Sequence, residues 1–118
     1  MATKPPARAP LTLDDVLARM TSAERDIADG LVALAGRVAP DLERRTWYGM
    51  LAWSRDGKTI MFFQDGTHFT SRYSTLGFQQ SAELDDGAMW PTSFAILELN
   101  HETSTRVAEL LARAVGQN

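Results

Sequence analysis

The alternation of apolar and polar residues predicts two helices in the first third of the chain. Thr12 followed by Asp15 is a capping signal for a short first helix. Thr21 and Glu24 have the spacing of a capping box for a second helix. One stripe of the second helix is apolar at the spacing i, i+4, i+7, i+11: Ile27, Leu31, Leu34 and Val38. Pro40 should end this helix, because the residue before a proline avoids the α conformation.

The pattern then changes to the period of β-strands. Runs at 46–54, 59–64 and 67–73 are rich in aromatic residues or alternate polar with apolar residues. Asp56-Gly57 and Asp65-Gly66 separate these runs. An Asp-Gly pair between two such runs is a hairpin signal, because glycine accepts the positive φ of a tight turn. We therefore predict a three-stranded antiparallel meander.

The rest of the chain predicts one more strand and a last helix. Residues 76–84 suggest a short helix or turn, 85–91 a loop, and 93–99 a fourth strand. Asn100 is suited to cap a helix that runs to about Val115 and stops at Gly116. This order indicates an α+β fold with two N-terminal helices, an antiparallel sheet of about four to five strands and a C-terminal helix. The helices should pack on one face of the sheet.

The predicted hairpins assign the strand residues to two faces of the sheet. Two-residue turns would pair Trp53 with Ile60, and would pair Phe62 with both Leu51 and Phe69. The face under the helices would then be almost wholly apolar: Trp47, Leu51, Trp53, Ile60, Phe62, Phe69 and Tyr73. The other face would consist of Tyr48, Met50, Ala52, Met61, Phe63, His68, Thr70 and Arg72. A bulge at either glycine would shift this register by one residue.

The second of these faces is the candidate binding site. A sheet covered by helices on one side normally presents a polar surface on the other, and contiguous exposed apolar patches usually bind something. We expect one contiguous surface that binds a small molecule or a protein partner, lined by Tyr48, Met50, Met61, Phe63, His68 and Arg72. The alternative is that residues 74–92 fold over this face and bury it as a second small core.

Composition and charge narrow the function further. The 118 residues suit one domain, 12–116, and the three prolines among the first ten residues predict a disordered N-terminal tail at 1–11. Twelve basic against fifteen acidic residues lack the basic excess of duplex-binding proteins, so no nucleic-acid partner is expected. No apolar run is long enough for a membrane span or a secretory signal, and we expect a cytoplasmic protein. The absence of cysteine excludes thiolate chemistry.

Motifs for catalysis are missing, and we predict a protein without enzymatic activity or cofactor. The sequence contains no Gly-x-Ser-x-Gly elbow and no phosphate-binding glycine loop. No second titratable group is visibly paired with His68. Arg44-Arg45 before Trp47-Tyr48 is a basic-aromatic cluster of the kind that single-strand-binding proteins use. In an acidic protein, pairing of these arginines with nearby carboxylates is the favoured interpretation.

The run Tyr48-Gly49-Met50, followed by Ala52-Trp53 and Met61-Phe62-Phe63, resembles the YdhG-like family of small bacterial domains of unknown function. His68 and the helix end at Pro40-Asp41 also match, whereas Leu51 stands where the family has proline. The resemblance covers about residues 12–115 and implies a sandwich similar to frataxin. It also implies an alternative function as an intracellular iron chaperone. Iron would then bind weakly to helix carboxylates, here Asp14, Asp15, Glu24 and Asp26, with Asp29 nearby.

Overall fold

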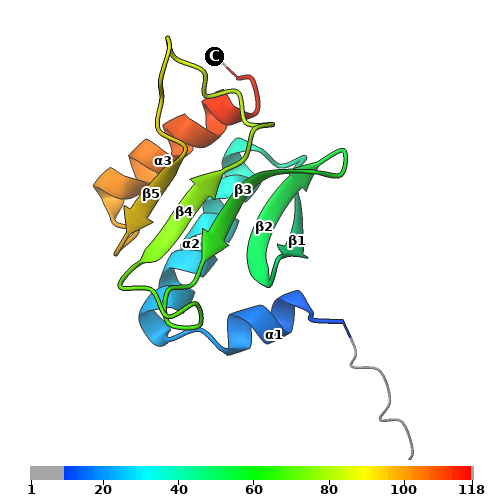
Figure 1. Ribbon diagram of the computed structural model, residues 1–118, viewed down its shortest axis with the longest axis vertical. Helices are drawn as coiled ribbons and strands as arrows, with labels where there is room; N and C mark the ends of the chain where they lie inside the picture. Colours follow the sequence, from blue (N-terminus) through cyan, green and yellow to red (C-terminus); the bar gives the residue numbers. More distant parts are fainter. Residues whose placement is uncertain (1–9, 118) are drawn as a thin grey trace, which may run out of the picture.

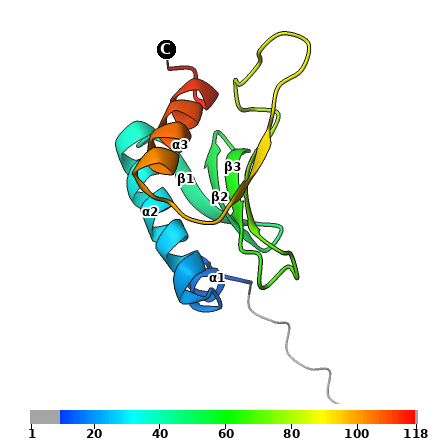
Figure 2. The ribbon, with the colours of Figure 1, turned by 90° about the vertical axis from the view of Figure 1, so that its left-hand side faces the viewer.

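The computed structural model describes residues 10–117 and confirms the predicted α+β fold. Its elements are α1 (Leu13–Ala18), α2 (Ser22–Val38), β1 (Glu43–Trp47), β2 (Met50–Arg55), β3 (Lys58–Gln64), β4 (Ser74–Phe78), β5 (Ser93–Ile96) and α3 (His101–Ala114). The five strands form one antiparallel sheet in the order β1-β2-β3-β4-β5. Helices α2 and α3 cover one face of this sheet, and α1 lies near one end of it (Figures 1 and 2). Residues 1–9 of the predicted tail lie outside the described residues.

Local capping explains where the three helices begin. Thr12 and Asp15 form a reciprocal capping box at α1, and Thr21 and Glu24 form another at α2. At α3 the N-cap is Asn100, whose side chain accepts a hydrogen bond from the backbone N–H of Thr103. Each cap satisfies backbone N–H groups that have no partner within the helix. Among residues 10–117, no helix has the length and apolar character needed to cross a membrane.

The first predicted strand is two strands. Tyr48 and Gly49 form a tight turn between β1 and β2, with φ angles of 49° and 76°. A two-residue hairpin turn requires positive φ at such positions, and an aromatic residue seldom adopts it. The aromatic run at 46–54 therefore contains the turn of a hairpin, and the prediction of one continuous strand is wrong.

The predicted strand at 67–73 is also wrong. Residues 66–70 form turns, and β4 begins only at Ser74. The backbone N–H of Ser71 donates to the carbonyl of Gly66 (2.9 Å), and the N–H of Gly66 donates to the hydroxyl of Ser74 (3.0 Å). These bonds fold the segment after β3 on itself. The sheet gains its fourth strand from 74–78 instead, where a helix or turn was predicted.

A β-bulge between β2 and β3 sets which side chains face the helices. The register joins Ser54 to Thr59 but Trp53 to Met61, so Ile60 is the extra residue. The predicted pairs of Trp53 with Ile60 and Leu51 with Phe62 are therefore wrong. The sheet residues buried in the helix-side core include Leu51, Trp53, Met61, Phe63, Leu76 and Phe78, each at most 4% exposed, together with Ile60 and Ile96. They form one core with helix residues that include Val16, Ile27, Leu31, Leu34, Val107 and Leu111.

The segment after β4 closes the end of this core. Ala82 and Leu84 are buried in it, and the backbone N–H of Glu83 donates to the carbonyl of Ala114 (2.9 Å). The loop that follows projects beyond the sheet near the end of α3 (Figure 1). The segment therefore does not form a second core over the other face, which overturns the alternative considered for residues 74–92.

Candidate functional site

The residues predicted to form one binding surface are separated by the observed register. Met61 and Phe63 have no exposed surface and lie in the helix-side core. Met50 faces the other way, because it alternates with Leu51 and Trp53 along β2. Tyr48 lies in the β1–β2 turn, and His68 and Arg72 lie exposed in the turns after β3. The prediction of a contiguous surface through these six residues is wrong for two reasons. The bulge at Ile60 moves Met61 and Phe63 into the core, and Tyr48, His68 and Arg72 lie in turns rather than in strands.

The structure shows a different set of residues on the side of the sheet away from the helices. We call this side the open face; alternation along the strands assigns to it Arg45 and Trp47 of β1, Met50 and Ala52 of β2, Phe62 of β3 and Gly77 of β4. Figure 2 shows the sheet from its edge, with α2 and α3 on one side only. The sequence pattern predicts Trp47 and Phe62 on the helix side, and this prediction is wrong.

Two aromatic rings dominate the open face. The ring centroids of Trp47 and Phe62 are 5.4 Å apart at an interplanar angle of 41°, and both side chains are half-buried. Met50 and Ala52 lie on the same face and are 7% and 0% exposed, although neither belongs to the helix-side core. The aromatic pair therefore shields a thin apolar layer and still presents ring surface to solvent.

Gly77 allows the ring of Phe62 to lie against the sheet. Gly77 is the register partner of Phe62, and a Cβ placed on it would collide with Cζ of that ring. A glycine inside a strand often marks such a close approach. The ring of Phe62 therefore lies over β4, in the space that a side chain at position 77 would otherwise fill.

A hollow of about 510 Å³ lies beside Trp47. Its lining consists of Arg45, Trp47, Gly57, Lys58, Thr59, Gln79, Gln80 and Ser81. The lining has two cations and no carboxylate, and neither Arg45 nor Lys58 forms an ion pair within residues 10–117. The arginine of the basic-aromatic cluster that was expected to pair with acidic neighbours is therefore available to a ligand.

Tyr48 extends the aromatic surface at the end of β1. Its ring meets that of Trp47 edge to face, with centroids 4.8 Å apart, and its side chain is 81% exposed. Of the predicted six residues, Tyr48 and Met50, the register partner of Trp47, therefore adjoin the observed aromatic pair. The glycine at 77 was the sequence signal that could have located this pair, but it has meaning only once β4 is recognised as a strand.

Two of the four helix carboxylates proposed for iron, Asp15 and Glu24, belong to capping boxes. Asp15 accepts a hydrogen bond from the backbone N–H of Thr12 (3.0 Å), which holds the pKa of its carboxyl below the ordinary value. Burial raises the pKa of Glu24, but the backbone N–H groups of Thr21 and Thr67 outweigh it, and the net shift is downward. Asp14 and Asp26 are exposed, and residues 10–117 contain no group of three or more His, Cys, Asp or Glu that could hold a metal ion.

Three comparisons with known proteins complete the description of the site. Neither protein-family models, nor curated proteins, nor solved structures gave a match to this chain. The resemblance to the YdhG-like family stays a prediction, as does the iron chaperone function that it implies. The geometry of the open face is therefore the basis of the functional proposal.

Proposed function

We propose that the protein binds a small planar anion on the open face of its sheet, as a non-enzymatic binding domain. The observation that supports this is the Trp47–Phe62 pair beside a hollow lined by Arg45 and Lys58. Exposed aromatic rings attract flat π-systems by stacking, and an adjacent guanidinium or ammonium attracts a carboxylate or phosphate. A ligand that has both parts would use the whole arrangement.

The shape of the surface favours a small ligand over a protein partner. A hollow of about 510 Å³ falls in the range of roughly 300–1,000 Å³ that small-molecule sites occupy. The side-chain amides of Gln79 and Gln80 and the hydroxyls of Thr59 and Ser81 line the hollow. These groups can donate hydrogen bonds to an anion or to the edge of a heterocycle.

The lining also favours binding without chemical conversion. Hydroxyl nucleophiles need an adjacent base, and the eight lining residues include neither a histidine nor a carboxylate. Thr59 and Ser81 are therefore assigned to hydrogen bonding.

The test is an NMR titration with adenosine monophosphate, 2-naphthoate, adenosine and inorganic phosphate. The two planar anions, adenosine monophosphate and 2-naphthoate, should shift the indole N–H signal of Trp47. They should bind about tenfold more tightly than adenosine, which lacks the anionic group, and than phosphate, which lacks the ring. Trp53 is an internal reference, since it is 1% exposed on the opposite face. No shift of Trp47 with either planar anion, or equal shifts of both indoles, would overturn the proposal.

Variants separate the two parts of the surface. Arg45→Gln should weaken both planar anions about tenfold and leave adenosine unaffected. Trp47→Leu should weaken the binding of every ligand that contains a ring, while the leucine keeps the open face apolar. Arg37→Gln is the matched control, because Arg37 is an exposed cation in the last turn of α2, away from the open face. If Arg37→Gln weakened binding as much as Arg45→Gln, general charge attraction would account for the effect.

A further inference from the structure

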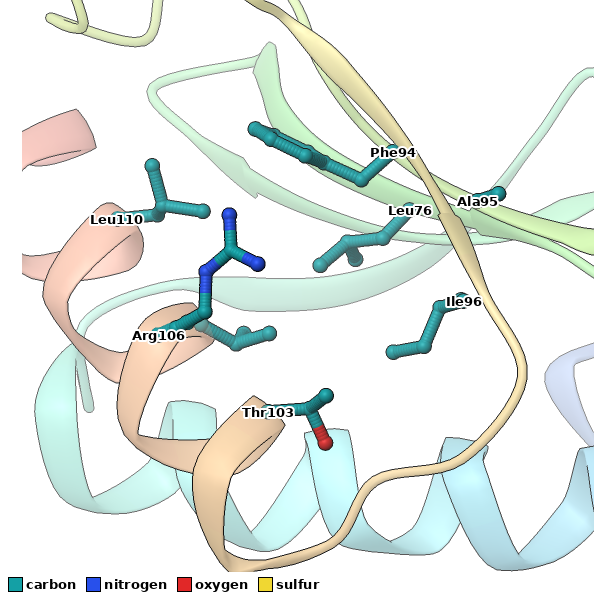
Figure 3. Close-up of a pocket in the computed structure, with 8 residues that line it drawn as sticks. Leu76, Phe94, Ala95, Ile96, Thr103, Arg106 and Leu110 are labelled. Atoms are coloured by element: carbon teal, nitrogen blue, oxygen red, sulfur yellow. The ribbon is translucent and has the colours of Figure 1, made fainter.

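A second pocket lies on the helix side of the sheet, between α3 and the edge strand β5. Its volume is about 80 Å³. Its walls are Leu76 of β4, Phe94, Ala95 and Ile96 of β5, and Thr103, Arg106, Val107 and Leu110 of α3 (Figure 3). None of these residues lines the hollow beside Trp47, so the two sites are separate.

Arg106 is the only charged residue of this second pocket. Figure 3 shows its side chain reaching from α3 toward the strands, with the guanidinium between Leu110 and Leu76 and next to Phe94. Glu102 and Glu109 stand four positions before and three positions after Arg106 on the same helix, where ion pairs commonly form. Within residues 10–117 Arg106 nevertheless forms no ion pair, so its charge is directed at the pocket without a protein partner.

The other polar side chain in the lining is already engaged. The hydroxyl of Thr103 donates to the carbonyl of Glu98 (2.8 Å) and accepts from the backbone N–H of Asn100 (2.8 Å), as part of the cap of α3. Figure 3 shows this oxygen turned away from the neighbouring lining residues. A ligand in the pocket would therefore meet apolar walls and one guanidinium.

We infer that this pocket binds a short aliphatic monocarboxylate, with its chain among Leu76, Ile96 and Val107 and its carboxylate on Arg106. A guanidinium matches a carboxylate with two parallel N–H···O bonds, which a lysine or a neutral group cannot reproduce. A volume of about 80 Å³ has room for about five to eight water-sized groups, at roughly 10–15 Å³ each. That size corresponds to a chain of about four to six carbons rather than to a long fatty acid.

The experiment is an NMR titration of the whole chain with pentanoate, 1-pentanol and acetate. Pentanoate should shift the methyl signals of Val107 and Ile96 and should bind about tenfold more tightly than pentanol, which lacks the charge, and than acetate, which lacks the chain. Equal affinity of pentanol would show that Arg106 takes no part. Equal affinity of acetate would show simple ion pairing. Either result would overturn the inference.

Variants of Arg106 keep the result independent of folding. Arg106 is exposed and has no protein partner among the described residues, so Arg106→Gln should fold as the parent does. It should weaken pentanoate about tenfold and leave pentanol unchanged, and Arg106→Lys should restore only part of the loss. Arg45→Gln is the control and should leave pentanoate binding unchanged. If Arg45→Gln weakened pentanoate and Arg106→Gln did not, the anion would occupy the open face, and the pocket at α3 would be excluded.

Discussion

Arg19 and Asp65 form a bidentate ion pair that joins the end of α1 to the turn after β3. Nε and Nη2 of Arg19 donate to the two carboxylate oxygens of Asp65, each over 2.9 Å. The side chain of Asp65 has no exposed surface, and that of Arg19 is 19% exposed. The same guanidinium donates to the carbonyl of Gly49 and lies 5.5 Å from the ring centroid of Phe69. One side chain thus connects α1, the β1–β2 turn and the β3–β4 turn.

Breaking this pair should strongly destabilise the protein. Asp65→Asn leaves a buried guanidinium without its charge partner, and the loss of one member of a buried pair costs about 3–5 kcal/mol. Arg19→Lys should also destabilise, because one ammonium cannot match both carboxylate oxygens and the carbonyl of Gly49. Urea unfolding of Asp65→Asn, Arg19→Lys and the double variant that combines them gives the coupling energy between the two residues.

The pair between Arg25 and Asp29 is the control for this measurement. It has the same Nε–Oδ distance of 2.9 Å, but its side chains are 45% and 59% exposed. An exposed i,i+4 pair on a helix contributes about 0.3–0.5 kcal/mol, so Arg25→Gln should be nearly neutral. A similar loss of unfolding free energy in Asp65→Asn and Arg25→Gln would contradict the conclusion that the buried pair stabilises the fold more than an exposed pair does.

The helices could be predicted from the sequence because their signals are local. The cap signals at Thr12, Thr21 and Asn100 involve residues no more than three positions apart, and all three residues are the N-caps of the observed helices. The β2–β3 hairpin at Asp56-Gly57 is also a local signal, whereas residues 65–73 and 79–92, which join the later strands, are not two-residue turns. The local signals depend on neighbours in the chain and need no knowledge of the tertiary structure.

The candidate site depends on features that are not local. Asp65-Gly66 has the sequence of a hairpin turn, but Asp65 pairs with Arg19, which lies far away in the sequence, and its segment folds into successive turns. The bulge at Ile60 has no marker in the sequence, and a shift of one residue moves every side chain to the other face. For this reason Phe63 faces the helix-side core and Phe62 faces the open side, the reverse of the prediction, and the predicted site does not form.

Phe62 and Phe63 provide a direct test of the observed register. They are neighbours on β3, but Phe63 has no exposed surface in the helix-side core and Phe62 is half-buried on the open face. Phe63→Ala should cost about 3–5 kcal/mol of the free energy of unfolding, as expected of a fully buried aromatic residue. Phe62→Ala should cost clearly less, because part of its ring already contacts water. Thermal and urea unfolding measure the stability of both variants. A larger loss of unfolding free energy for Phe62→Ala than for Phe63→Ala would show that the two faces are assigned the wrong way round.

Gly77 and Phe62 should show compensating substitutions. Gly77→Ala places a methyl group where the ring of Phe62 lies, and overpacking of this kind costs about 1–3 kcal/mol. The double variant Gly77→Ala/Phe62→Ala removes the collision, so it should be more stable than the sum of the two single changes predicts. Gly36→Ala is the control, since a Cβ at Gly36 meets no atom within 4 Å and lies inside α2, where alanine is favoured. Strict additivity at 77 and 62 would contradict the close approach.

Glu24 connects the start of α2 to the turn after β3 through its two oxygens. Oε1 accepts from the backbone N–H of Thr21 (2.9 Å), and Oε2 accepts from that of Thr67 (2.8 Å). Burial raises the pKa of this carboxyl, and these hydrogen bonds lower it below the ordinary value of 4.5 by a larger amount. A folded-state pKa below the unfolded one stabilises the fold at pH values above 4.5, and this stability is lost as the pH falls through the folded-state pKa.

Glu24→Gln should therefore destabilise the protein at neutral pH and matter less in acid. The amide of glutamine has one acceptor oxygen, so one of the two backbone donors would face an NH₂ group, at a cost of about 1–3 kcal/mol. Because wild type loses the contribution of its ionised carboxylate below its folded-state pKa, the two unfolding free energies should converge as the pH falls below 4.5 and through that pKa. Asp26→Asn removes an equal charge from an exposed position in the same helix and should stay within about 0.5 kcal/mol of wild type at pH 7. A gap between Glu24→Gln and wild type that is as large in acid as at neutral pH would show that hydrogen bonding to the carboxylate is not its cause.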